Sequence, residues 1–376
     1  MRRELDYLCF QPTREGQASR AHVYEIVAGL RRRGWTVEVI EPPHPRTGRA
    51  DALRRAFAAG GTQLRYWIGH RFKPARVVYI RTHFLSLPSA VVARLAGAIV
   101  VQEVNGAIDD VFAAWPALRH IRWLISGAIR LQLRWANAVI TVTPGLADYY
   151  AALVGRQGRI HVVGNGANVD LFTPTLREET ERRYAVFVGA LAPWQGVEVA
   201  LDAANSTDWP ADVDLVIAGD GMGRATVDDA SKTNPRVRWL GTIPQSQAAE
   251  LTASSLAALV PMAMSARSGH GLSPLKLFEA MASGVPVVAS DLPGLEDVVR
   301  AHDCGILYPP GDAGALARAV AQLDMDPGRA AEMGHRGREA AVANYSWDAR
   351  AGQTEEILLQ LEQEKPPART PQAAGR

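Results

Sequence analysis

The sequence predicts an α/β protein with two doubly wound, Rossmann-like domains facing a central cleft. Its 376 residues suffice for two domains of ordinary size, each with a complete hydrophobic core. In both halves short β-branched segments alternate with helical ones, a pattern typical of parallel sheets covered by helices. The pattern restarts near residue 184, where a second series of strands and helices begins.

The charge distribution also fits two lobes. Residues 1–175 contain 23 Lys+Arg and 12 Asp+Glu, and the remainder contains 18 and 27. Lobes of opposite net charge suit domains that face each other, and a basic first half suits an acidic acceptor or an anionic membrane surface. Nucleic acid is not expected as a partner, because no helix-turn-helix, zinc-finger or RNA-binding signature accompanies the basic residues.

Composition indicates a cytoplasmic protein. The chain is 47% hydrophobic and 21% charged, and no apolar run approaches the roughly 18 residues of a membrane span. The first residues, M-R-R-E-L-D, do not resemble a signal peptide. Cys9 and Cys304 lie far apart and form neither a metal-binding nor a redox spacing, so a reducing compartment is expected.

The first half opens as a Rossmann-like unit. We expect a strand at Tyr7–Phe10, a loop at Gln11–Arg20, a helix over about Ala21–Arg33 and a strand at Trp35–Ile40. The loop lacks the G-x-G-x-x-G pattern, so the sequence gives little support for dinucleotide binding. Further strands are expected at Val77–Arg81, Ile99–Glu103, Ala138–Val142 and Ile160–Val163.

Two stretches of the first half are rich in arginine and apolar residues. Residues 44–75 are interpreted either as a solvated helical hairpin or as a contact for acceptor or membrane. The second stretch is an amphipathic helix with arginines on one face, which either packs on the core or docks on a membrane surface. Its predicted apolar face consists of Ile121, Leu124, Ile125, Ala128, Ile129 and Trp135, and its basic face of Arg119, Arg122, Arg130 and Arg134.

The second half contains the stretch with the clearest chemistry, residues 268–294. Ser273 is the expected N-cap and Pro274 the first residue of a helix that ends at Gly284, followed by a strand at Val285–Ala289. The start of a helix attracts anions, and Lys276 adds a full charge there. Glu279 follows roughly 4.5 Å along the axis, where its carboxylate could accept ribose hydroxyls. An ordinary helix with a solvated Lys–Glu pair is the alternative.

Other strands of this half are expected at Tyr184–Val188, Asp214–Ala218, Val237–Leu240 and Ala257–Val260. The acidic residues at 212–214 precede a strand, so we interpret them as structural and expect no metal site.

The run S-P-L-K-L-F-E-A-M-A, from Ser273 to Ala282, resembles the nucleotide-sugar site of the family 4 retaining glycosyltransferases, in its S-P-L-K-L-F-E variant. The resemblance extends over nearly the full length and implies the GT-B fold. It further implies transfer of a sugar, with retention, from a nucleoside diphosphate sugar to a hydroxyl of a glycan or lipid-linked acceptor, as in envelope polysaccharide synthesis. No cofactor or metal is implied, and donor base, UDP or GDP, is left open.

The resemblance also assigns roles to residues. Lys276 and Asn105 take catalytic positions, and Asn105 stands in V-N-G where relatives have a histidine that contacts the donor sugar. Donor contacts fall on Gly16, Gln17, Thr242, Ile243, Ser273, Pro274, Leu275, Lys276 and Glu279. Glu103, Gln195 and His270 are additional candidates.

The chain departs from the family at three positions. Gly271 stands where many relatives have a glutamate, and Ala190 and Gln195 stand where an arginine and a lysine hold the diphosphate. A sugar-nucleotide epimerase of related fold and a non-catalytic sugar-nucleotide-binding protein are therefore kept as alternatives.

The expected organisation has four parts. Residues 1–178 form the acceptor-side domain and residues 179–345 the nucleotide-sugar-binding domain. A final helix over 346–363 crosses back to the first domain, and residues 364–376 form a disordered tail. Peripheral contact with an anionic membrane is expected of the basic first half.

Overall fold

The computed structural model describes residues 3–11, 13, 17–43, 51–155, 157–175, 182–265 and 268–364. The chain forms two compact units. One contains Met1–Val163 together with Ala351–Arg376, and the other contains Gly164–Arg350. The boundary therefore falls at Val163, before the position predicted from the sequence, which lies in the segment 176–181 outside the described residues. That the units face each other across a cleft stays a prediction.

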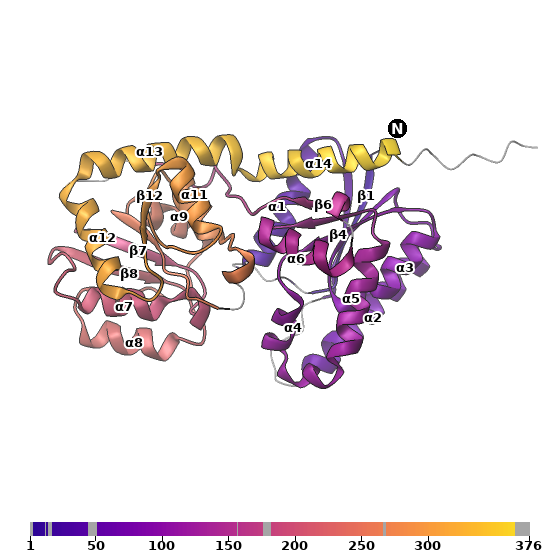
Figure 1. The fold of residues 1–376 in the computed structure, drawn as a ribbon, viewed down its shortest axis with the longest axis horizontal. Coiled ribbons are helices and arrows are strands. Elements are labelled where there is room, and N and C mark those ends of the chain that lie inside the picture. The colour runs from indigo at the N-terminus through magenta and orange to yellow at the C-terminus, as the bar shows by residue number, and fades with distance from the viewer. Residues whose placement is uncertain are drawn as a thin grey trace, which may run out of the picture. The chain divides into compact units, whose positions relative to one another are not determined.

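The first unit is built on a six-stranded parallel sheet in the order β2-β1-β3-β4-β5-β6. Figure 1 labels β1, β4 and β6 of this sheet. Its central strands are buried on both faces, as expected of a sheet covered by helices. The strands are β1 (Glu4–Cys9), β2 (Thr36–Ile40), β3 (Val77–Arg81), β4 (Ile99–Val104), β5 (Ala138–Thr141) and β6 (Ile160–Val162).

Helices connect these strands and cover the sheet. They are α1 (Ala18–Arg32), α2 (Asp51–Gly69), α3 (Leu87–Leu95), α4 (Ile108–Ala114), α5 (Arg122–Trp135) and α6 (Pro144–Val154). One core cluster joins α2 and α3 to β1, β3 and β4, and another joins α4, α5 and α6 to β4 and β5. Short 3₁₀ turns lie at Phe84–Ser86, Pro116–Ile121 and Gln157–Arg159.

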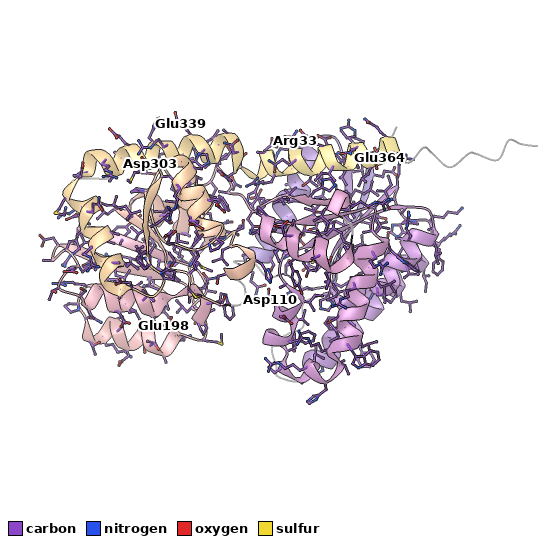
Figure 2. The ribbon with its side chains drawn as sticks, viewed as in Figure 1. Arg33, Asp110, Glu198, Asp303, Glu339 and Glu364 are labelled. Atoms are coloured by element: carbon purple, nitrogen blue, oxygen red, sulfur yellow. The ribbon has the colours of Figure 1, made fainter. Side chains whose placement is uncertain are left out.

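The last helix, α14 (Trp347–Glu364), packs on this unit through charged side chains. Glu355 accepts from Arg3 Nη1 at 2.6 Å and from Trp35 Nε1 at 3.0 Å. Arg33, seen beside α14 in Figure 2, brings Nη1 to 3.7 Å from the same carboxylate. The helix continues through Glu364, which the sequence assigned to the tail; the rest of the tail lies outside the described residues.

The second unit repeats the architecture with a parallel sheet in the order β12-β11-β10-β7-β8-β9. Its strands are β7 (Arg183–Val188), β8 (Val213–Ala218), β9 (Val237–Trp239), β10 (Ala257–Val260), β11 (Val287–Ser290) and β12 (Gly305–Tyr308). Side chains alternate along β7, β8, β10, β11 and β12 between two core clusters, one on each face of the sheet.

Helices α7 and α12 pack on one face of this sheet and α9, α10 and α11 on the other. The helices are α7 (Val197–Asn205), α8 (Arg224–Thr233), α9 (Gln245–Ala253), α10 (Leu275–Ala282), α11 (Leu295–His302), α12 (Ala313–Met325) and α13 (Pro327–Asn344). The predicted doubly wound α/β fold is thus confirmed for both units.

Two details of the first half differ from prediction. The arginine-rich stretch forms one continuous helix, α2, where a hairpin was one of the two interpretations. Neither Gly60 nor Gly61 breaks it, because tertiary packing of residues such as Tyr66 and Trp67 outweighs the low helix propensity of glycine. Residues 44–50 lie outside the described part.

The buried face of α5 also differs from the predicted one. The 3₁₀ turn that ends at Ile121 precedes the α-helix, so Ile121 does not share the helical phase of the residues in α5. The buried residues are Ile125, Ile129, Gln132 and Leu133, whereas Ile121, Leu124 and Trp135 are exposed. Among the described residues no helix combines the length and apolar character required to cross a membrane.

Candidate functional site

Helix α10 begins one residue later than predicted. Its N-cap is Pro274, with φ −74° and ψ 137°, and no side chain caps the helix. Ser273 is held elsewhere, because its Oγ accepts from the Asn165 backbone N–H at 3.1 Å and its carbonyl accepts from Asn165 Nδ2 at 2.5 Å. Ser273 therefore fixes the loop that enters the helix, and the first backbone N–H groups of α10 have no side-chain cap.

Lys276, in the first turn, extends toward the carboxyl end of β7. Its Nζ lies 3.9 Å from the ring centroid of Phe187, a cation–π contact. The ammonium is buried and has no hydrogen-bond partner among the described residues. Burial lowers the pKa of Lys276 to about 7, although the nearby Glu279 acts in the opposite direction. An anion placed beside this buried ammonium would stabilise its charged form.

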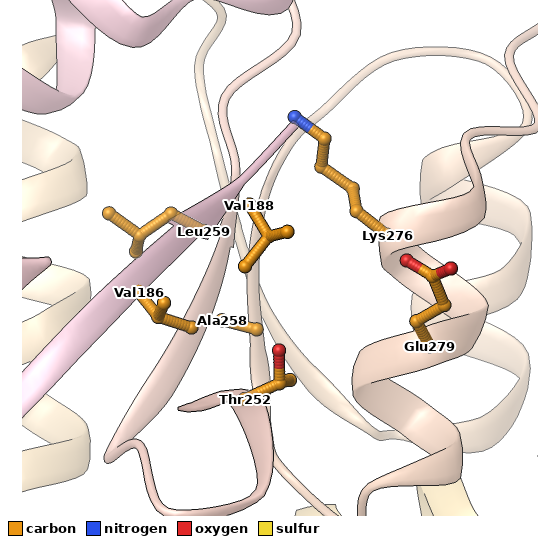
Figure 3. A pocket seen from close by; sticks show the side chains of 7 residues that line it. All are labelled: Val186, Val188, Thr252, Ala258, Leu259, Lys276 and Glu279. Atoms are coloured by element: carbon orange, nitrogen blue, oxygen red, sulfur yellow. The ribbon is translucent and has the colours of Figure 1, made fainter. Parts of the chain in front are cut away.

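Glu279 projects from the same face of α10, one turn further on (Figure 3). Burial raises its pKa to about 7, opposed by Lys276 and by a hydrogen bond with Gln245. Both side chains line a small pocket whose apolar wall comes from β7 and β10, with Thr252 of α9 at its base. Because both side chains are half-buried, the alternative of a solvated Lys–Glu pair does not describe them.

Two glycines lie in the loops near the end of the Lys276 side chain. Gly189, directly after β7, has φ +150°, and a Cβ added there would lie 3.2 Å from Lys276 Nζ. Gly219, directly after β8, has φ +145°, and its Cβ would meet the Gly189 carbonyl oxygen at 1.8 Å. Only glycine allows these two loops to approach each other and the lysine so closely. Such backbone is suited to close approach by a ligand.

The loop after β9 joins the same edge of the sheet. Gly219 N–H donates to the Gly241 carbonyl at 2.7 Å, and Thr242 and Ile243 follow directly. Thr242 is exposed and Ile243 half-buried. The structure therefore brings the predicted base-contacting residues to the carboxyl edge of the sheet, toward which the Lys276 side chain also extends and where α/β proteins bind ligands.

Gln195 lies in a 3₁₀ turn, Pro193–Gln195, that packs against the end of β10 through the Trp194 carbonyl and Ala263 N–H, 3.1 Å apart. Its Oε1 is buried and lacks a hydrogen-bond partner in the described part of the chain. His270 is half-buried in the 3₁₀ turn Ser268–His270. Gly271 has φ +79°, so a glutamate there would also be strained in this backbone.

Two candidates of the first unit, Glu103 and Asn105, lie at the end of β4. Asn105 Nδ2 donates to Oε1 of the buried Glu103 at 2.6 Å. Gln17 is the exposed N-cap residue of α1, and its side chain makes no capping bond. Gly16 lies outside the described residues.

Among the described residues, one cluster of three side chains could hold a metal ion. Asp6, Glu38 and His70 each place a ligand atom within 4.8 Å of the others, and no sequence spacing had indicated them. They belong to β1, β2 and the residue after α2, in the first unit, and none of them lines the pocket of Lys276.

Several residues around Lys276 were not predicted as site residues. Gly189 and Gly219 carry a usable signal, since each directly follows a strand in the runs G-A-L and G-D-G. Phe187, Asn165 and Gln245 carry none, because their roles depend on contacts between segments distant in sequence.

Two domain families match the two halves of the chain. A glycosyl transferase 4-like domain matches residues 18–166, and a domain described as glycosyl transferases group 1 matches residues 182–326. Together with the two Rossmann-like units, these matches identify the chain as a GT-B glycosyltransferase of the group 1 type.

Individual relatives agree with this family. The chain is 30% identical over 262 residues to an alpha-maltose-1-phosphate synthase of Mycolicibacterium smegmatis, covering 62% of this chain and 65% of that protein. It is 31% identical over 245 residues to a GDP-mannose-dependent alpha-mannosyltransferase of Mycobacterium tuberculosis, covering 62% and 57%. The match thus spans less than two thirds of these relatives. Sucrose-phosphate synthase from Thermosynechococcus elongatus shares the fold, with TM-score 0.76 at 20% identity over 96% and 99% of the two chains.

Proposed function

We propose that this protein transfers a sugar from a nucleoside diphosphate sugar to a hydroxyl of a glycan or lipid-linked acceptor, with retention of the anomeric configuration. The observation that carries the proposal is the buried Lys276 ammonium, without a hydrogen-bond partner in the described structure, between the start of α10 and Gly189. A diphosphate placed there would accept from this ammonium and from backbone N–H groups at the start of α10, where no side chain caps the helix.

Each candidate residue then has its own role in binding or transfer. Lys276 and the start of α10 stabilise the charge that develops on the leaving diphosphate, while Glu279 accepts the ribose hydroxyls. Thr242 and Ile243 contact the base, and Asn105 contacts the donor sugar. No general base is assigned, because the leaving phosphate can itself accept the proton of the acceptor hydroxyl.

A second candidate function is sugar-nucleotide binding without turnover. It is favoured by Gly271, Ala190 and Gln195, where relatives carry charged residues that hold the donor. Incubation with radiolabelled UDP- and GDP-sugars distinguishes the candidates: transfer or donor hydrolysis supports the proposal, and an epimeric product indicates an epimerase. A saturable complex that leaves both donors intact would indicate a binding protein.

The proposed reaction should not require a metal ion. Charge stabilisation comes from Lys276 and the start of α10, so donor turnover should survive EDTA. The group Asp6, Glu38 and His70 gives a control, because His70→Ala should leave turnover unchanged. Loss of turnover on chelation, restored by Mg²⁺ or Mn²⁺, would contradict the proposed role of Lys276.

Nucleotide affinity should decrease as pH rises above about 7. The pKa of Lys276 is lowered to about 7 in the free protein, and a bound diphosphate would raise it by stabilising the ammonium. Binding above pH 7 must therefore include uptake of a proton by Lys276, which binding well below pH 7 does not require. Titration calorimetry of UDP or GDP in buffers of different ionisation enthalpy measures this uptake, which Lys276→Met should abolish. Equal affinity at pH 7 and pH 9 would disprove the prediction.

We further propose peripheral docking of the first unit on the anionic inner face of a membrane. An exposed apolar stripe on α5 consists of Trp123, Leu124, Leu131 and Trp135, and Arg119, Arg122, Arg130 and Arg134 are exposed around it. This combination matches helices that lie in a membrane interface.

Binding to anionic vesicles should therefore weaken when salt is added, because attraction between exposed charges is screened within about 8 Å at physiological salt. Replacing Arg130 and Arg134 by glutamine should reduce binding, whereas Arg300→Gln in the second unit serves as the control. Sedimentation with phosphatidylglycerol vesicles measures the effect. Absence of binding at low salt, or binding indifferent to salt, would rule the docking out.

A further inference from the structure

One buried carboxylate organises the carboxyl edge of the first sheet. Glu103, at the end of β4, is 1% exposed and accepts five hydrogen bonds from four segments of the chain. Its Oε2 accepts from Tyr7 Oη at 3.0 Å, Tyr79 Oη at 2.9 Å and His22 Nε2 at 3.1 Å. Its Oε1 accepts from Arg81 Nη1 at 2.8 Å and Asn105 Nδ2 at 2.6 Å.

The surroundings keep this carboxylate charged and fixed. Burial alone would raise the pKa of Glu103, but His22, Arg81 and Asn105 hold it well below its usual range. The two tyrosine rings that donate to it are stacked, with centroids 4.9 Å apart and planes at 24°. Such a carboxylate can only accept hydrogen bonds, so it determines how neighbouring polar groups are oriented.

Asn105 is the group whose orientation matters. Because Glu103 accepts from its side-chain nitrogen, the amide has a defined orientation, and Oδ1 is not the atom facing the carboxylate. The following residue is also held, since the Gly106 carbonyl accepts from Tyr150 Oη at 2.8 Å. The half-buried Asn105 thus offers a carbonyl oxygen in a fixed direction.

We propose that Glu103 is a positioning residue: it holds the Asn105 amide so that Oδ1 accepts a hydroxyl of the donor sugar, an inference that rests on the proposed function. Glu103 also fixes the start of α1 through His22, which lies five residues after the N-cap Gln17. One carboxylate therefore aligns both first-unit segments that were predicted to contact the donor.

The first test exchanges the polarity of the pair. Asn105→Asp places two carboxylates at hydrogen-bond distance and should lower kcat by roughly a hundredfold, the order expected when a reacting group is displaced by about 1 Å. Adding Glu103→Gln supplies an amide donor opposite the new carboxylate, so the double variant should regain at least about tenfold over Asn105→Asp. Such a recovery would show that the side chains of residues 103 and 105 interact directly, because Glu103→Gln alone should lower kcat. Nucleotide affinity of the Glu103→Gln variant should stay within about threefold of the wild-type value.

A matched control separates positioning from stability. Glu355 is another carboxylate of the first unit with several donors, Arg3 and Trp35 among them, and Glu355→Gln should change the melting temperature but not kcat. If the double variant is no faster than Asn105→Asp, or if folded Glu103→Gln has normal kcat, the proposed positioning role is wrong.

A second readout does not depend on turnover. In protein labelled with [¹⁵N]asparagine, the side-chain amide of Asn105, identified by its loss in Asn105→Ala, should show one strongly downfield proton. Glu103→Gln should move that proton upfield. If Glu103→Gln does not move the Asn105 amide proton, the inference is wrong. If the wild-type protein shows the downfield proton but transfers no sugar, the Glu103–Asn105 pair is present and the proposed function is wrong instead.

Discussion

Lys276→Ala should lower sugar transfer by at least about tenfold. A charge-assisted hydrogen bond contributes roughly 1.5–3 kcal/mol, and 1.36 kcal/mol corresponds to a factor of ten in rate. The contribution should be largest in the transition state, because negative charge grows on the leaving diphosphate while the buried ammonium has no other hydrogen-bond partner in the described structure. The effect should therefore appear mainly in kcat.

Lys232→Ala is the matched control. Lys232 is exposed on α8 and pairs with Asp228 at 2.6 Å, so its loss should leave turnover unchanged. The family pair can also be restored: Ala190→Arg with Gln195→Lys should return part of the activity of Lys276→Ala. Normal turnover by a Lys276→Ala protein with an unchanged melting temperature would show that the diphosphate does not bind here.

Glu279→Ala should weaken nucleotide binding by roughly ten- to a hundredfold, which corresponds to losing charge-assisted hydrogen bonds to the ribose. The ribose contacts are the same in the ground and transition states, so KM or Kd should change more than kcat. Titration of UDP and GDP against the variant measures the loss.

A nucleotide without ribose hydroxyls makes this test specific. Wild-type protein should lose similar affinity for the 2′,3′-dideoxy nucleotide, whereas the Glu279→Ala variant should not distinguish it from the normal nucleotide. Glu250→Ala, at an exposed position of α9, is the control. If Glu279→Ala still discriminates against the dideoxy nucleotide, another residue binds the ribose.

The fold could be predicted because its signals are local. Each buried parallel strand is a short apolar run, and each helix is long enough to show its own pattern. Element ends were less exact, since caps depend on distant partners. Ser273 looked like an N-cap, but Asn165, 108 residues earlier, engages both its hydroxyl and its carbonyl.

The position of Lys276 could be predicted from sequence, but its environment could not. A lysine at the start of a helix is visible in the sequence, whereas its burial over Phe187 and beside Gly189 depends on how α10 packs on β7. The same holds for Glu103: residue spacing shows a glutamate two positions before Asn105, yet its donors come from β1, β3 and α1. Contacts of this kind exist only after the sheet has formed.

Chemical labelling can show whether the diphosphate end of the donor lies at Lys276. A nucleoside diphosphate carrying an aldehyde on its terminal phosphate should form an imine with the Lys276 amine, whose pKa of about 7 makes it reactive, and borohydride should fix the product. The chain has only four lysines, Lys73, Lys232, Lys276 and Lys365, so peptide mass spectrometry can assign the site. We expect one label per chain, on Lys276, and we expect UDP or GDP to prevent it. Label on another lysine, or label on Lys276 that neither nucleotide prevents, would show that the diphosphate does not bind at Lys276.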